Sequence, residues 1–329
     1  MAHLFKKVNQ QHVPPNDCVK QNTECKDKYI IKHIKAYWQL YILLLPAFVY
    51  TLVICYKPMY GILIAFKDYS PRRGIWGSEW VGFKHFERLF SSYWFPITLK
   101  NTLTISLLSL ILTTPIPIMF ALIINETKNV KYRKFVQTVS YAPHFISTVV
   151  LCGMIFLFLD VKSGFVSKIV EFVVGEPIVF MQDPHWFKWV YIISGVWQGM
   201  GWSSIIYFAA LSGVDKALLE AAEIDGATRI QRIRYINLPT IMPTIAIMFI
   251  LSCGNLISVG YEKAYLLQTA PNLSASEIIS TYVYKVGLID GDYEFSTAAS
   301  LFNTVVNVTM LLIANKLSKK ITDNEVSLF

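Results

Sequence analysis

The sequence predicts an all-α protein that crosses a lipid bilayer six times. Hydrophobic residues make up 54% of its 329 residues, and its mean hydropathy is +0.43. Charged residues make up only 16% and are clustered, which leaves several apolar runs of the roughly 18 residues that a helix needs to span a bilayer. Soluble domains rarely have this composition. We therefore assign the net charge of +8 to loops that orient the chain in the lipid bilayer, and we expect no nucleic acid partner.

The apolar runs, taken in order, place the spans. Prolines inside them are expected to form kinks or helix ends, as membrane helices tolerate, and the third span is expected to kink near Pro143. The spans form one transmembrane domain over 37–320, between a basic tail at 1–36 and a short tail at 321–329. The expected spans are about 37–66, 97–125, 135–159, 188–211, 238–259 and 295–317.

Two connecting segments have sequence features typical of segments that lie at a membrane surface. The loop 67–96 is rich in glycine and aromatic residues, and we expect it to rest at the outer interface. The segment 164–174 places Phe165, Ile169 and Phe172 at helical spacing, which predicts a short amphipathic helix.

Lysine and arginine are distributed unevenly between the two sides of the predicted bundle. With the N-terminus inside, the cytoplasmic segments carry 18 of these residues and the opposite loops carry 10. Positively charged loops tend to remain in the cytoplasm. We therefore expect both termini and the loop 212–237 to be cytoplasmic.

The loop 212–237 is the longest strongly polar interruption between spans in the second half of the chain. It contains Glu220–Glu223, then Asp225 and Gly226, then a basic run. Alanine and glutamate favour helix, and glycine tolerates backbone angles that other residues avoid. We expect two short helices joined at Gly226, with acidic residues in a first turn and arginines near the end, as the helix dipole favours. By composition alone, an interfacial amphipathic helix without a partner is the better interpretation of this loop.

The same loop resembles the EAA loop in the membrane subunits of ABC importers. That motif has Glu-Ala-Ala, three further residues, a glycine and a later proline. These places are taken here by Glu220, Ala221, Ala222, Gly226 and Pro239, with Asp225 and Ala227 beside the glycine. The resemblance implies a type I ABC importer permease fold, in which this loop is the coupling helix that sits in a cleft of a cytoplasmic ATPase.

Further stretches extend the resemblance over 37–320. They read YWQLYILLLPAFVY, GSEWVGFKHFERLF, ISVGYEKAYLLQ and ISTYVYKVGL. They are similar to the sugar-permease branch that handles complex oligosaccharides and polysaccharides, the LplB and alginate-permease type. This resemblance implies a bacterial plasma membrane location. The implied partners are a second permease subunit, a cytoplasmic ATPase dimer that binds ATP and Mg, an extracytoplasmic solute-binding protein and an oligosaccharide.

Motifs of catalysis are missing from the sequence. It has no G-x-x-x-x-G-K-[ST], no H-E-x-x-H and no G-x-S-x-G. The chain is therefore expected to bind no ATP itself, to hold no cofactor or metal, and to be no enzyme. Of its five cysteines, three lie in spans, and Cys18 and Cys25 lie in the tail without a histidine at metal spacing, which predicts neither disulfides nor a zinc site.

Uncharged polar residues in the spans are candidates for a sugar path. Amides can bond sugar hydroxyls, and tryptophans offer flat stacking faces. Asn303 and Asn307 are four residues apart and share one helix face. The alternative is that such amides tie helices together in lipid, and both readings remain open for this pair. Glu262 and Lys263 are more often solvated charges, with contact to substrate or binding protein as the alternative. The candidates are Trp197, Gln198, Trp202, Asn255, Glu262, Asn303 and Asn307.

The sequence thus predicts the translocation subunit of an ABC importer for oligosaccharides, which works by ATP-driven alternating access. The alternative is an ion-coupled secondary transporter of a small polar solute, although acidic residues that relay protons are missing from the predicted spans. A membrane-embedded glycan-modifying enzyme would need catalytic acids. For that hypothesis the only weak candidates are Asp290, Asp292 and Glu294.

Overall fold

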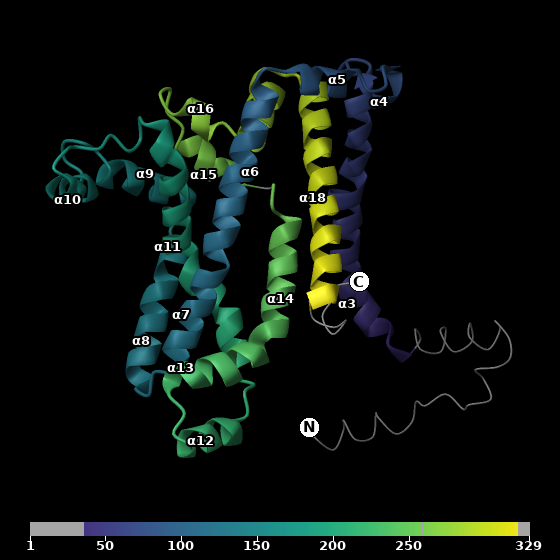
Figure 1. The fold of residues 1–329 in the computed structure, drawn as a ribbon. Coiled ribbons are helices and arrows are strands. Elements are labelled where there is room, and N and C mark those ends of the chain that lie inside the picture. The colour runs from purple at the N-terminus through teal and green to yellow at the C-terminus, as the bar shows by residue number, and fades with distance from the viewer. Residues whose placement is uncertain (1–35, 258, 322–329) are drawn as a thin grey trace. The chain divides into compact units, whose positions relative to one another are not determined.

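A computed structural model describes residues 36–257 and 259–321 (Figure 1). Except for Ala36 and Ile321, the two predicted tails lie outside these residues, and so do Cys18 and Cys25. The chain divides into two compact units, Met1–Gly61 and Ile62–Phe329, which are described separately.

One apolar helical run begins in the first unit and ends at the start of the second. α3 (Trp38–Tyr50), the π-helix η2 (Thr51–Tyr56) and the 3-10 helix η3 (Lys57–Phe66) follow one another, and together they are long and apolar enough to cross a membrane. No residue of α3 is buried within the chain. A helix that is apolar and exposed all round is typical of one that lipid or another subunit covers.

The second unit starts with a small aromatic cluster. β1 (Lys67–Asp68) pairs antiparallel with β2 (Glu79–Trp80), and these two-residue strands form the sheet of the described chain. Phe66 stacks on Trp80 with ring centroids 5.5 Å apart. The helices α4 (Gly74–Gly77) and α5 (Lys84–Ser91) complete this segment.

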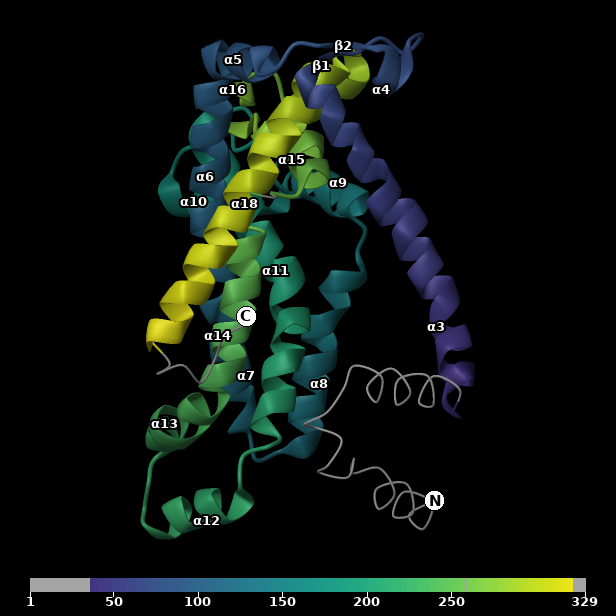
Figure 2. The same ribbon diagram turned by 90° about the vertical axis from the view of Figure 1, so that its right-hand side faces the viewer.

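Four long helices form the frame of the second unit. α6 (Trp94–Thr113) and α7 (Pro115–Asn125) follow each other as one apolar span. α11 (Pro184–Leu211) packs against both, and α14 (Leu238–Gly254) packs against α11 and α18 (Tyr293–Ile321) (Figure 2). Buried apolar side chains join α7, α11 and α14, among them Ile118, Leu122, Tyr207, Leu211 and Ile241.

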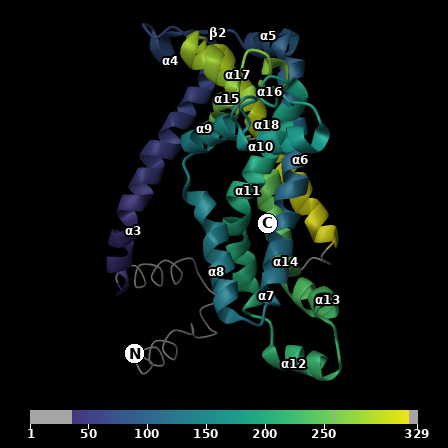
Figure 3. The same cartoon turned by 90° about the vertical axis from the view of Figure 1, so that its left-hand side faces the viewer.

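The expected single kinked helix at 135–159 is instead two helices at a large angle. α8 (Val130–Tyr141) runs into a 3-10 turn, η4 (Ala142–Phe145), and α9 (Thr148–Phe158) follows at 99° (Figure 3). The proline in η4 cannot continue the hydrogen-bond ladder. Ile146 then takes an extended conformation, and the Ser147 side chain caps the next helix by accepting from the Val150 backbone N–H.

The sequence predicts six spans. In the described residues, four helices are long and apolar enough to cross a membrane, and a fifth span results if the bent pair of α8 and α9 is counted as a single span. The remaining candidate is α11, which is 28 residues long. At 1.5 Å per residue it reaches across a bilayer. It contains glycine, serine, glutamine and tryptophan residues, which are less apolar than leucine or isoleucine, and it is not among the helices that meet the hydropathy criterion. The all-α membrane class is confirmed.

Short helices occupy the connections at the two ends of the second unit. α10 (Phe165–Val174) forms where the sequence predicts a short amphipathic helix, and it begins one residue after the predicted start. α12 (Lys216–Ile224), α13 (Arg229–Arg232) and the π-helix η5 (Ile233–Asn237) lie at one end of the unit in Figure 1. The opposite end holds α15 (Tyr261–Leu266), α16 (Leu273–Ser276) and α17 (Ile279–Tyr284), which continues into the π-helix η6 (Lys285–Ile289) (Figures 1 and 3).

Candidate functional site

The loop 212–237 has the two short helices that the sequence predicts. α12 ends at Ile224, and Gly226 turns the chain with a φ of 77°, in the left-handed region that favours glycine. α13 then begins with Thr228 as its cap, in a reciprocal capping box with Gln231. The loop therefore has a defined shape that its own local hydrogen bonds support.

The acidic residues of this loop do not lie in a first turn, contrary to the expectation. α12 begins at Lys216, and the Asp215 side chain caps it by accepting from the Ala217 backbone N–H at 2.9 Å. Glu220 is therefore in the middle of the helix and is exposed to solvent. Its charge has little interaction with the helix N-terminus, because the dipole effect is confined to the first turn.

Apolar side chains are exposed on both sides of Gly226. Ile224 is 86% exposed and Ile230 is 76% exposed. The same loop and η5 line a cavity of about 310 Å³, and its lining residues are Ala222, Asp225, Gly226, Ala227, Gln231, Arg232, Tyr235 and Ile236. The loop therefore presents apolar side chains at its surface on either side of the turn.

A buried ion pair ties this loop to the end of α7, and the sequence reasoning did not find it. Arg232 donates to Glu126 through Nε at 3.2 Å and Nη2 at 2.7 Å. Asn237 donates to the other oxygen of the same carboxylate at 2.8 Å. The available signal was an acid placed directly between an apolar span and a basic loop.

A second ion pair joins the same two segments at the surface. Lys128 donates to Glu223 at 2.8 Å, and both side chains are largely exposed. The hydrogen bond and charge of Lys128 lower the pKa of Glu223 below its usual value.

The structure gives Asn303 and Asn307 different surroundings on one face of α18. Both line a cavity of about 460 Å³ whose other polar lining residues are Tyr261, Ser280, Tyr284, Ser296, Ser300 and Thr304. Asn307 Oδ1 accepts from the Ile257 backbone N–H at 2.9 Å. Asn303 Oδ1 is buried and has no hydrogen-bond partner among the described residues. Asn307 thus ties α18 to Ile257, just past the end of α14, whereas the Asn303 oxygen makes no such contact among the described residues.

Asn255 lies just past α14 rather than inside a span, because that helix ends at Gly254. It lines a separate cavity of about 230 Å³ with Ser106, Ser109, Leu110, Thr113, Tyr191, Ser252, Leu256, Val259 and Gly260. This cavity is also lined largely by neutral hydrogen-bonding groups.

Gln198 and Trp202 face the break between α8 and α9. Gln198 Nε2 donates to the Ile146 carbonyl at 2.9 Å. Trp202 stacks on the His144 ring, with centroids 4.4 Å apart. Neither residue lines the cavity of Asn303 and Asn307 or the cavity of Asn255, and neither does the exposed Trp197. The structure therefore does not bring these three residues together with the asparagines.

Lys263 is buried, contrary to the expectation of a solvated charge, while its neighbour Glu262 is exposed. Lys263 Nζ donates to the Tyr191 carbonyl at 2.8 Å and lies 4.7 Å from the centroid of that ring. Burial lowers the pKa of Lys263 to about 8, since the charged form is poorly solvated there.

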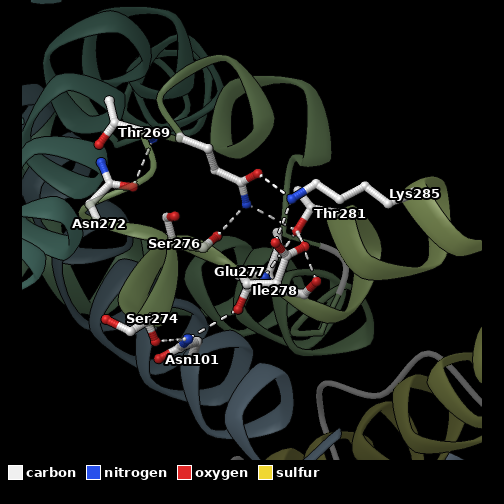
Figure 4. A network of polar contacts seen from close by, with 10 residues as sticks. Asn101, Thr269, Asn272, Ser274, Ser276, Glu277, Ile278, Thr281 and Lys285 are labelled. Atoms are coloured by element: carbon white, nitrogen blue, oxygen red, sulfur yellow. Dashed lines mark hydrogen bonds and ion pairs between the residues drawn. The ribbon is translucent and has the colours of Figure 1, made fainter. Parts of the chain in front are cut away.

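Polar contacts hold the segment between α14 and α18 in place (Figure 4). Glu277 pairs with Lys285, which also donates to Gln268 Oε1 at 2.9 Å. Asn101 on α6 donates to the Glu277 carbonyl at 3.0 Å. Because these groups bond one another, the buried Glu277 carboxylate has a structural explanation.

The acidic cluster near residue 290 is not arranged as a pair of catalytic acids. Asp292 accepts from Arg88 at 2.6 Å through one oxygen, and its other oxygen caps α18 at the Phe295 backbone N–H. Among the described residues, no group of three or more potential ligands is placed to hold a metal ion.

Residues 113–323 match the family described as binding-protein-dependent transport system inner membrane component. The polygalacturonan/rhamnogalacturonan transport system permease protein YteP of Bacillus subtilis (strain 168) is 42% identical, over 95% of this chain and 98% of that protein. Protein LplB of the same organism is 41% identical, over 85% of this chain and 88% of that protein.

A similar chain occurs in the crystal structure of a bacterial ABC transporter involved in the import of the acidic polysaccharide alginate. The TM-score is 0.82 at 42% identity, covering 89% of this chain and 99% of that one. A second structure shows that bacterial alginate transporter in complex with an alginate pentasaccharide-bound periplasmic protein. It matches with a TM-score of 0.82 at 41% identity, over 90% of this chain and 99% of that one.

Proposed function

Because this chain belongs to the family of binding-protein-dependent transport system inner membrane components, we propose that it imports fragments of acidic polysaccharides by ATP-driven alternating access. It is a non-catalytic permease subunit of a sugar ABC importer. The observation that carries the substrate class is its similarity, along nearly its whole length, to permeases named for polygalacturonan, rhamnogalacturonan and alginate. Each of these glycans contains uronic acid residues.

The lining of the cavity that contains Asn303 and Asn307 fits a hydrated glycan. Hydroxyl groups of serine, threonine and tyrosine and the amide of Asn303 both donate and accept, so they can replace the water around sugar hydroxyls and carboxylates. The lining includes no charged residue, so no cation in it would trap an acidic sugar tightly. A site that binds too strongly would slow release to the cytoplasm. Trp197, Gln198, Trp202, Asn255 and Glu262 remain candidates for other parts of the path.

The substrate class is tested on the complete purified complex in lipid. Its ATPase activity should rise when the binding protein is loaded with an oligogalacturonide. A neutral galacto-oligosaccharide of the same length is the matched control and should give little stimulation. Stimulation by the neutral sugar alone would assign the importer to neutral glycans.

We propose that the loop from Glu220 to Ala227 docks on a cytoplasmic ATPase dimer, which binds the ATP and Mg. The exposed Ile224 and Ile230 would supply apolar contacts, and the αL turn at Gly226 would set the angle between the two short helices. A second permease chain would complete the translocation path.

The chain is an inner membrane component of its transporter. We propose that residues 37–320 form the membrane domain, with the tails 1–36 and 321–329 and the loop 212–237 in the cytoplasm. The 18-to-10 distribution of lysine and arginine supports this orientation.

Single cysteines in a cysteine-free variant test the orientation on intact cells. A membrane-impermeant thiol reagent should label position 290 and should not label positions 6 and 229. Asp290 and Arg229 are both exposed, so access to the residue itself does not limit labelling. Labelling at 229 without labelling at 290 would contradict the proposed topology.

A further inference from the structure

Glu126 accepts three hydrogen bonds from one segment of the loop region. Two come from the guanidinium group of Arg232 and one from the amide of Asn237, at 2.7 to 3.2 Å. The side chains of Arg232 and Glu126 are only 11% and 10% exposed. Two guanidinium N–H groups share one carboxylate oxygen, Oε2, and the Asn237 amide bonds the other, Oε1, so both oxygens of this nearly buried carboxylate are satisfied by charge-assisted or amide hydrogen bonds.

The three residues belong to two different groups of helices within the second compact unit. Arg232 and Asn237 lie in the continuous helical run α13–η5–α14, Arg229–Gly254, which joins the loop 212–237 to α14 without a break. Glu126 caps the end of α7, which packs along α11. The Glu126 carboxylate is therefore a link between the helix that leaves the loop and the helix pair α7–α11 beside it.

We propose that Glu126 is a positioning residue for transport: it makes α7 move together with α13 and α14 when the ATPase displaces the loop. This inference rests on the proposed function. A buried carboxylate separated from Arg232 would leave two unpaired charges out of water, so the contact holds while the helices move. The neighbouring pair of Lys128 and Glu223 lies in solvent, and water can replace each partner at little cost.

These two ion pairs provide matched variants, because both join the 126–128 segment to the coupling loop. Glu126→Ala removes the buried link, and Lys128→Ala removes the exposed one. A charge swap, Glu126→Arg with Arg232→Glu, restores opposite charges at the site. Asn237 Oδ1 is buried and without a hydrogen-bond partner in the described chain, so it can accept from the introduced arginine.

The first readout is glycan taken up per ATP hydrolysed, measured for the complete complex in proteoliposomes. Without the link, ATP hydrolysis can displace the loop without moving α7, so each ATP moves less glycan. We expect Glu126→Ala to lower the ratio severalfold, the swap to recover part of the loss, and Lys128→Ala to leave the ratio within about twofold of wild type. A purely structural role would reduce the yield of assembled complex and leave the ratio unchanged, which would overturn the proposal.

The second readout does not need sugar. Spin labels on the exposed positions 123 of α7 and 235 of η5 report the distance between α7 and η5 in the complete complex. The distance should be the same in the nucleotide-free and ATP–vanadate states of wild type and should differ between them in Glu126→Ala. A wild-type distance that changes with nucleotide overturns the inference. Constant distance without any glycan uptake would instead contradict the proposed function and support the link.

Discussion

Replacing Gly226 by proline is expected to abolish glycan uptake and substrate-stimulated ATP hydrolysis while the complex still assembles. Gly226 has a φ of 77°, whereas proline is fixed near −65°. Proline also removes the backbone N–H that donates to the Glu223 carbonyl at 3.2 Å. Both effects change the angle between α12 and α13, the surface that we propose meets the ATPase.

Two further substitutions at Gly226 separate backbone conformation from side-chain volume. A Cβ at this position would meet no atom within 4 Å, so space does not limit substitution. Asparagine tolerates the left-handed region and should retain most uptake. Alanine should lose stability by about 1–2 kcal/mol and give intermediate uptake. Wild-type uptake by the proline variant would show that this turn does not couple the loop to the ATPase.

Asn303→Leu is expected to lower glycan uptake about tenfold without lowering thermal stability. The change removes an oxygen that has no hydrogen-bond partner among the described residues, so folding loses no bond at that oxygen. A bound sugar would lose one hydrogen bond in a buried site, worth up to about 1.5 kcal/mol, or about tenfold in affinity. Uptake and melting temperature are to be measured on the same preparation.

Asn307→Leu is the matched control, one helical turn away on the same face of α18. It removes the acceptor for the Ile257 backbone N–H, and Ile257 is fully buried. Leaving that N–H unpaired should cost about 1–3 kcal/mol of stability. Lower stability of Asn303→Leu with unchanged uptake per folded complex would remove Asn303 from the sugar path.

The long apolar helices and the shape of the loop 212–237 could be predicted because both depend on local sequence. Apolar runs without charge have few alternatives in a bilayer, and Gly226 is where the left-handed turn occurs. The break after Pro143 was harder to predict. A proline in a membrane helix fits both a mild kink and a full change of direction, and the extended conformation of Ile146 decides between them.

Contacts between distant segments could not be predicted from the pattern. Glu126 and Arg232 are 106 residues apart, and each is ordinary in its own loop. Asn303 and Asn307 are the same residue type and share a helix face. Their hydrogen bonding differs because the Ile257 backbone N–H lies within reach of Asn307. Lys263 also looks like a surface charge in sequence, but the packing of α15 against α9 and the position of Tyr191 bury it.

The most direct test of the account is glycan uptake into proteoliposomes that contain the complete complex. The account predicts uptake that requires internal ATP hydrolysis and the loaded binding protein, is lost in Gly226→Pro, and persists when a proton ionophore removes the pH gradient. Uptake that continues without the ATPase or ATP and stops when an ion gradient is dissipated would contradict it, and would identify an ion-coupled transporter instead.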